Sequence, residues 1–281
     1  MTTQQMQRAG INGRELEFTV RGAGEPVILI HGSHVADAFA PVLADPALIG
    51  QYRLISYHRC GFAGSAHPDG PVSIAQQAAD CRALMRHLGI GRAHIVGHSY
   101  GGVITLQLAL DFPDAVRSLA LLEPALLAVP SAGEFMEAMG PVLQVYESGD
   151  KAGAVDAFLQ AVCGPNYRSA VEAVLPPGAF DQAMADADTF FRIEMPALQQ
   201  WSFTPEEARR IVQPVLAVLG ADSEAVWPGF GEGHRLLREW LPDAEAFVLP
   251  NATHLLQMQN PRGLAEALAG FFSRHPLPGY D

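Results

Sequence analysis

The chain has 281 residues, of which 49% are hydrophobic and only 17% charged, so it can bury a large core and is not a disordered protein. Its 18 basic and 30 acidic side chains give a net charge of −12, which would repel a nucleic-acid backbone or an anionic membrane surface. We therefore expect neither a nucleic-acid nor a membrane partner. The polar N-terminus and three cysteines without a paired spacing favour a cytoplasmic location. The sequence leaves the oligomeric state open.

Short apolar runs typical of buried strands alternate along the chain with amphipathic stretches. We expect strands at residues 15–20, 27–30, 54–57, 94–96, 118–122, 215–219 and 246–249, the first of them at a sheet edge. Residues 73–88 carry a helical apolar stripe, with Ser73 as N-cap and Gly89 at the end. This alternation predicts an α/β fold with a mainly parallel sheet that helices flank on both faces.

Residues 124–213 are too long for one crossover between strands and hold apolar helical segments of their own. We expect them to form a helical cap (lid) domain on a core built from residues 1–123 and 214–281. Some apolar side chains of such a cap would line a pocket. The candidate substrate-binding residues are large apolar side chains of this segment and one histidine outside it: Phe135, Met136, Met139, Phe190, Trp201 and His34.

A Gly-His-Ser-Tyr-Gly sequence at residues 97–101 lies between the expected strand at 94–96 and a helix that begins near residue 102. A serine in this context is typical of a nucleophile elbow, where small flanking residues leave room for a sharp turn that exposes the serine oxygen. Ser99 is therefore the candidate nucleophile. A serine hydroxyl is weakly nucleophilic until a base removes its proton, so an imidazole must lie within hydrogen-bond reach.

His254 fits this base best among the ten histidines of the chain. It lies on a loop after the expected strand at residues 246–249, at the same carboxyl edge of the sheet as Ser99. His94 and His98 lie along a strand about 13 Å apart, so they do not form a two-histidine metal site. We expect no metal and no other cofactor.

Four motifs in this order resemble those of the α/β-hydrolase superfamily, and the resemblance covers nearly the whole chain. Besides the elbow, the motifs are His-Gly-Ser at residues 31–33, similar to the oxyanion loop, residues 59–65, similar to the R-x-G-x-x-G-S loop, and Ala-Thr-His at residues 252–254, similar to the catalytic-histidine loop. The resemblance implies a mainly parallel eight-stranded sheet with a cap inserted after strand 6. It also implies an oxyanion hole formed by the backbone N–H groups of Ser33 and Tyr100.

The carboxylate that would orient His254 has two candidates. Most members of the superfamily have Gly-x-x-Asp after the seventh strand, but here Ser223 stands at that position and Asp222 one residue earlier, where its side chain points the other way. Glu123 ends the sixth strand, from which some branches, such as zearalenone-type lactonases, take their acid. We favour Glu123 and keep Asp222 as the alternative. His58 is a second departure, because relatives usually have Asp there.

These residues together imply a cofactor-free serine hydrolase of uncharged, apolar carboxylic esters or lactones, acting through a Ser-His-acid triad and an acyl-enzyme. Hydrolysis of a C–C bond or perhydrolysis could use the same residues. A ligand-binding receptor on the same scaffold is the alternative from another class of protein. A dehalogenase is disfavoured, because Ser99 stands where those enzymes need Asp. The physiological substrate depends on side-chain directions that the sequence does not give.

Overall fold

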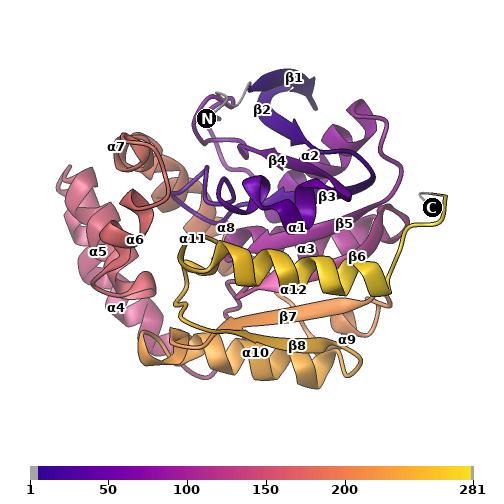
Figure 1. Cartoon of the computed structure of the whole chain (residues 1–281). Helices are drawn as coiled ribbons and strands as arrows, with labels where there is room; N and C mark the ends of the chain where they lie inside the picture. Colours follow the sequence, from indigo (N-terminus) through magenta and orange to yellow (C-terminus); the bar gives the residue numbers. More distant parts are fainter. Residues whose placement is uncertain (1–5, 280–281) are drawn as a thin grey trace.

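The computed structural model describes residues 6–279 and is built around a central sheet (Figure 1). Within these residues the sheet has eight strands in the order β1-β2-β4-β3-β5-β6-β7-β8. The strands are β1 (Gln7–Ile11), β2 (Arg14–Arg21), β3 (Glu25–Ile30), β4 (Tyr52–Tyr57), β5 (Ala93–His98), β6 (Val116–Leu122), β7 (Val215–Gly220) and β8 (Glu245–Leu249). All neighbouring strands are parallel except β1–β2 and β2–β4. The predicted mainly parallel α/β sheet is confirmed.

The N-terminal edge of the sheet differs from the prediction in one strand. β1 pairs outside β2, so the strand expected at residues 15–20 is not an edge strand. β1 has only two buried side chains, Ala9 and Ile11, and a strand that buries so little shows too short an apolar alternation to be recognised.

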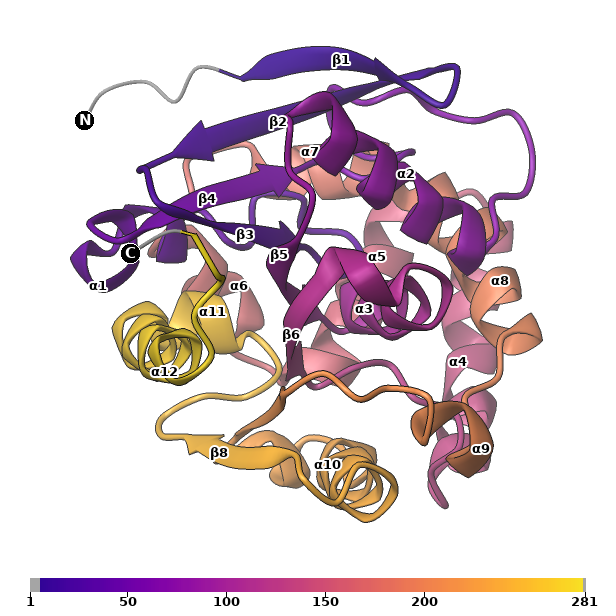
Figure 2. The same cartoon turned by 90° about the vertical axis from the view of Figure 1, so that its right-hand side faces the viewer.

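Helices cover both faces of the sheet because side chains alternate along each strand. Ile28 and Ile30 of β3 belong to the core on one face, whereas Val27 and Leu29 belong to the core on the other. Figure 2 shows α3 and α12 on opposite sides of the strands. The core helices are α1 (Pro46–Ile49), α2 (Ile74–His87), α3 (Tyr100–Asp111), α10 (Gly229–Trp240), α11 (Leu256–Gln259) and α12 (Pro261–Arg274), with short 3₁₀ turns η1 (Val42–Ala44), η2 (Pro113–Ala115) and η4 (Ser223–Ala225).

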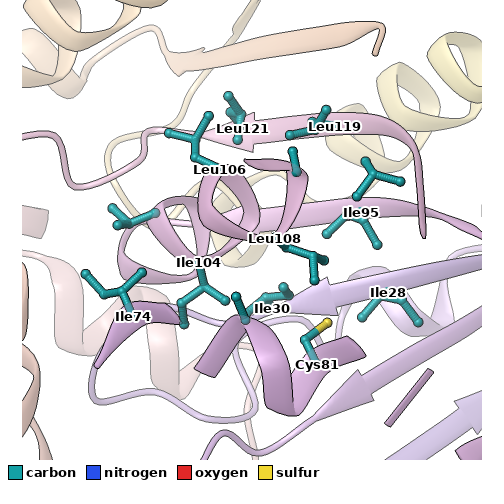
Figure 3. Packing of buried hydrophobic residues seen from close by; sticks show 14 of the residues in the cluster. Ile28, Ile30, Ile74, Cys81, Ile95, Ile104, Leu106, Leu108, Leu119 and Leu121 are labelled. Carbon is teal, nitrogen blue, oxygen red and sulfur yellow. The ribbon is translucent and has the colours of Figure 1, made fainter. Parts of the chain in front are cut away.

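The helix predicted at residues 73–88 is confirmed as α2. Ser73 accepts a hydrogen bond from the backbone N–H of Gln76, and the Gln76 side chain accepts one from the backbone N–H of Ser73, which together form a capping box. The apolar side chains of α2 and α3 pack on those of the strands, with Cys81 of α2 and Ile104 of α3 among them (Figure 3).

A helical insertion, residues 124–213, connects β6 to β7. Its elements are α4 (Ala132–Glu147), α5 (Lys151–Cys163), α6 (Tyr167–Glu172), α7 (Ala179–Ala185), the π-helix η3 (Thr189–Glu194), α8 (Met195–Gln200) and α9 (Pro205–Ala208). Figure 1 shows α4 to α7 gathered at one end of the sheet, on the left. Buried side chains of the insertion form an apolar cluster of their own that also includes Val35, Leu219 and Leu255 from the core. The insertion therefore packs on the loops at this end of the sheet.

His58, the second departure from the superfamily pattern, follows β4 and lies between two carboxylates. Its Nδ1 is 2.9 Å from Glu17 Oε2, and its Nε2 is 2.9 Å from Asp37 Oδ1. Burial alone lowers the pKa of His58, but the hydrogen bonds and negative charges of Asp37 and Glu17 outweigh burial and raise the pKa above the usual 6.5. When protonated, the imidazole thus connects β2 to the loop that follows β3.

We expect His58 to stabilise the fold at low pH more than at high pH. Because the pKa is higher in the folded than in the unfolded state, the stabilisation is fully present below about pH 6.5 and is lost as the pH rises through the folded-state pKa. The difference in unfolding free energy between the wild type and His58→Gln should therefore shrink between about pH 6 and pH 9. Urea unfolding measures it, with His87→Gln, an exposed histidine of α2, as control. A difference that stays constant or grows with pH would contradict this account.

Candidate active site

Ser99 lies at the sharp turn between β5 and α3, where the sequence predicts the elbow. Its backbone has φ 52° and ψ −119°, a conformation that residues other than glycine rarely adopt. A Cβ atom at Gly97 would lie 2.4 Å from the carbonyl oxygen of Gly101, and one at Gly101 would lie 2.2 Å from that of Ile30. The turn therefore needs glycine on both sides of Ser99, and it leaves the serine side chain partly exposed.

The imidazole of His254 is hydrogen-bonded to Glu123. His254 Nδ1 lies 2.6 Å from Glu123 Oε2, and the backbone N–H of Gly220 donates to Glu123 Oε1 at 2.7 Å. An ionised carboxylate only accepts hydrogen bonds, so His254 carries its hydrogen on Nδ1 and leaves the lone pair on Nε2. Glu123 has a positive φ of 43° at the end of β6 and is buried. Both carboxylate oxygens are thus occupied, which fixes the side chain.

Asp222, the alternative acid, lies apart from this pair. Its side chain is exposed, although its backbone N–H donates to the carbonyl of Ala252 in the histidine loop at 2.9 Å. The next residue, Ser223, is fully buried. Of these two consecutive residues after β7, one is thus exposed and the other buried, in line with the sequence argument. The geometry favours Glu123 as the partner of His254.

Three residues that the sequence analysis did not assign a role surround His254. His98 Nε2 donates to the backbone oxygen of His254 at 2.7 Å, and Gln257 Nε2 donates to His98 Nδ1 at 3.2 Å. Burial, together with the nearby His254, lowers the pKa of His98 well below its usual range, so this imidazole is neutral. The Phe230 ring stacks on His254 with centroids 4.2 Å apart. None of these three contacts has a signal in the sequence, because each joins residues far apart along the chain.

The backbone amides of Ser33 and Tyr100 have the properties expected of oxyanion donors. Neither N–H donates a hydrogen bond to another group within residues 6–279, and both residues line the same cavity as Ser99 and His254. Tyr100 begins α3, whose first N–H groups have no partner inside the helix. The positive end of the α3 dipole therefore points at the cavity.

The cavity at Ser99 is apolar and lies between the insertion and the core. Its volume is about 90 Å³. One water molecule needs about 10–15 Å³, so the cavity has room for a small organic group. Of the described residues that line it, none is Lys, Arg, Asp or Glu. Its large side chains are Phe135, Met136, Phe158, Phe190 and Met195 from the insertion, and Trp227, Phe230 and Met258 from the core.

Phe135, Met136 and Phe190 thus line the cavity, but three other candidate substrate-binding residues do not. Met139 is 1% exposed and packs inside the insertion's own apolar cluster. Trp201 lies away from the cavity, where its Nε1 donates to Gln107 Oε1 at 2.8 Å. His34 is buried behind the cavity wall against Phe158 and Phe190, and burial lowers its pKa to about 3.

The structure adds two observations on metals and membranes. Within residues 6–279, no cluster of three or more His, Cys, Asp or Glu side chains has the geometry to hold a metal ion. In the same range, no helix combines the length and the apolarity needed to cross a bilayer.

A family model described as the alpha/beta hydrolase fold matches residues 25–261. The chain is 28% identical over 258 residues to an uncharacterized carboxylesterase, nap, of Bacillus subtilis, which covers 88% of this chain and 79% of that protein. It is 25% identical over 272 residues to a 2-hydroxy-6-oxo-6-(2'-aminophenyl)hexa-2,4-dienoic acid hydrolase of Metapseudomonas resinovorans, with 93% and 89% covered. Both relatives are hydrolases by name.

A solved structure adds evidence on the fold. The enol-lactonase of Burkholderia xenovorans LB400 superposes with a TM-score of 0.77 over 95% of this chain and 100% of that chain. At 23% identity this likeness shows the fold alone. The family match, however, spans most of the sequence, including the elbow and the histidine loop. The chain therefore belongs to the α/β-hydrolase fold family.

Proposed function

We propose that this protein is a cofactor-free serine hydrolase of small, uncharged, apolar carboxylic esters or lactones. The observation that carries the proposal is the hydrogen bond between His254 Nδ1 and Glu123 Oε2, because it fixes the tautomer of a histidine that lines the same apolar cavity as Ser99. Nucleophile, base and orienting acid are then all side chains of the protein, so the reaction needs no cofactor. We also propose residues 124–213 as the cap domain that covers this site, with residues 1–123 and 214–281 as the core.

In the proposed reaction, His254 Nε2 takes the proton of the Ser99 hydroxyl while the serine oxygen attacks the substrate carbonyl carbon. The carbonyl oxygen becomes negatively charged and accepts hydrogen bonds from the backbone N–H groups of Ser33 and Tyr100. The C–O bond to the leaving alcohol breaks, and protonated His254 returns the proton to that alcohol. Water then attacks the acyl-enzyme by the same route, which releases the acid and restores Ser99. Glu123 keeps His254 in the required tautomer throughout.

The lining of the cavity favours uncharged substrates. A substrate carboxylate would lie among apolar walls without a counter-ion, because none of the described residues that line the cavity is charged. One relative is named for a dienoic acid substrate, and such an acid suits this cavity poorly. Hydrolysis of esters or lactones is therefore favoured over hydrolysis of C–C bonds in acidic substrates.

A series of nitrophenyl esters with straight acyl chains tests this proposal. We expect kcat/KM to rise about fourfold for each added methylene, since a buried CH₂ contributes about 0.8 kcal/mol, until the acyl group fills the cavity. A hemisuccinate ester, matched in length to the pentanoate, should react at least about 100-fold more slowly, because its carboxylate would be desolvated. Matched lactones with alkyl tails of increasing length should follow the same trend.

Absence of turnover in both series would contradict the proposed function. Faster turnover of the charged esters would contradict the substrate class alone.

A further inference from the structure

The peptide group that joins Gly32 to Ser33 is held at its carbonyl end. The carbonyl oxygen of Gly32 accepts hydrogen bonds from Arg59 Nη2 at 2.9 Å and from His31 Nδ1 at 2.6 Å. A trans peptide is planar, with its N–H opposite its C=O, so the Ser33 N–H must point away from Arg59. The backbone is also close to the nucleophile, because a Cβ at Gly32 would lie 3.0 Å from Ser99 Cβ.

Arg59 contacts the Gly32–Ser33 peptide group and the side chain of Tyr100, so it touches both residues whose amides form the proposed oxyanion hole. It is 1% exposed, and its Nε donates to the carbonyl oxygen of His31 at 2.9 Å. Its guanidinium also lies over the Tyr100 ring, 5.0 Å from the centroid. A cation bound to a peptide carbonyl polarises the peptide and makes its N–H a stronger donor. The orientation and the strength of the Ser33 amide therefore both depend on Arg59.

Glu194 of the cap completes this network. One carboxylate oxygen pairs with Arg59 Nη1, and the other accepts a hydrogen bond from Ser33 Oγ at 2.6 Å. Glu194 is fully buried, and burial raises its pKa, whereas Arg59 and Ser33 oppose that shift. A buried charge without its partner is strongly unfavourable, so Arg59 and Glu194 require each other.

The same part of the cap also contacts the loop that contains Arg59 at other residues. Asp186 accepts a hydrogen bond from the backbone N–H of Ala63 at 2.8 Å, and Thr189 Oγ1 donates to the carbonyl oxygen of Gly61 at 2.5 Å. Neither contact reaches residues 31–33. Two contacts of the cap can therefore be compared. The contact of Glu194 with Ser33 and Arg59 reaches the oxyanion loop, whereas the contact of Thr189 with Gly61 only attaches the cap to the core.

We propose that Glu194 is a positioning residue for hydrolysis: through Arg59 and Ser33 it holds the Ser33 amide in the orientation that stabilises the oxyanion, so the site is complete only when the cap is in place. This inference rests on the proposed function. Glu194 does not touch the reacting atoms. It acts by fixing a backbone donor that the sequence motif alone leaves free to rotate.

The test compares Ser33→Ala, Glu194→Gln and the double variant with Thr189→Val as the control. Ser33→Ala keeps the amide and the buried ion pair but removes the hydrogen bond to Glu194. Loss of a whole oxyanion donor lowers kcat by about 10²–10³-fold, so a misaligned donor should lower it by about 10–100-fold with KM changed by less than about threefold. The double variant should lose less than the product of the two single losses. Thr189→Val should stay within about twofold of the wild type.

Affinity for a trifluoromethyl ketone provides a second measurement, which would not change if Glu194 had a purely structural role. This inhibitor forms a tetrahedral oxyanion on the nucleophile, so its Ki should rise across the variants by the same factor by which kcat/KM falls. Wild-type kcat and Ki in Ser33→Ala would overturn the inference, and so would an equal loss in Thr189→Val. If Glu194→Gln does not fold, the kcat and Ki of Ser33→Ala alone test the inference. Failure of the proposed function is distinguishable, because it would appear either as absence of turnover in the wild type or as turnover that Ser99→Ala retains.

Discussion

Replacement of Ser99 by alanine is expected to lower kcat for ester hydrolysis by about 10⁴–10⁶-fold, the scale on which loss of the nucleophile disables a serine triad. The fold should remain intact, because the lost oxygen lies at a partly exposed turn and fills no core space. We expect the unfolding free energy to change by less than about 0.5 kcal/mol. Nitrophenyl ester kinetics and urea unfolding measure the two effects separately.

Covalent labelling provides the control for this variant. A fluorophosphonate should add one equivalent of mass to the wild type and to Ser273→Ala, an exposed serine on α12, but none to Ser99→Ala. Residual activity of Ser99→Ala above about one hundredth of the wild type would remove Ser99 from the nucleophile role.

The second large effect is expected at Glu123. Glu123→Gln should lower kcat by about 10³–10⁴-fold, whereas Asp222→Asn should change it by less than about twofold. The amide oxygen of glutamine can face only one of the two donors that Glu123 now accepts from, His254 Nδ1 and the Gly220 N–H. If the amide nitrogen faces His254, the imidazole must move its hydrogen to Nε2 and can no longer act as the base.

Steady-state kinetics of the two amide variants decide between the acids, because both substitutions keep the size of the side chain but remove its charge and replace one acceptor oxygen by a donor nitrogen. A larger loss in Asp222→Asn than in Glu123→Gln would assign the orienting role to Asp222.

Most strands of the sheet can be predicted from the sequence, since each gives a pattern among neighbouring residues. The strand at residues 27–30 and the helix start at Ser73 can be predicted, because strand patterns and helix caps involve residues close together along the chain. β1 cannot be predicted, because Ala9 and Ile11 are its only buried residues and give too short an apolar alternation. What makes it a strand is its pairing with β2, a contact with no local signature.

The candidate site divides in the same way. Ser99 and His254 lie in local motifs, and the structure places both on one cavity. Choosing between Glu123 and Asp222 requires the direction of each side chain at a strand end, which the backbone geometry sets. The cavity walls are harder still, because Phe135 and Trp201 are both large aromatic residues of the insertion, yet only Phe135 faces the cavity. Glu194 did offer a signal, as an acidic residue in a mostly apolar stretch of the insertion.

Glu194 lies on a π-helical turn, so the number of residues in this segment determines the direction of its carboxylate. The turn spans Thr189–Glu194 and continues directly into α8, Met195–Gln200. A π-turn closes its hydrogen bonds one residue later than an α-turn, so deleting one residue would let the segment relax into an ordinary α-helix. Each residue advances an α-helix by about 100°, and the deletion would therefore rotate the carboxylate at position 194 away from Arg59. Among related chains, a one-residue alignment gap in this segment should accompany loss of the acidic residue, whereas substitutions that keep the length leave it in place.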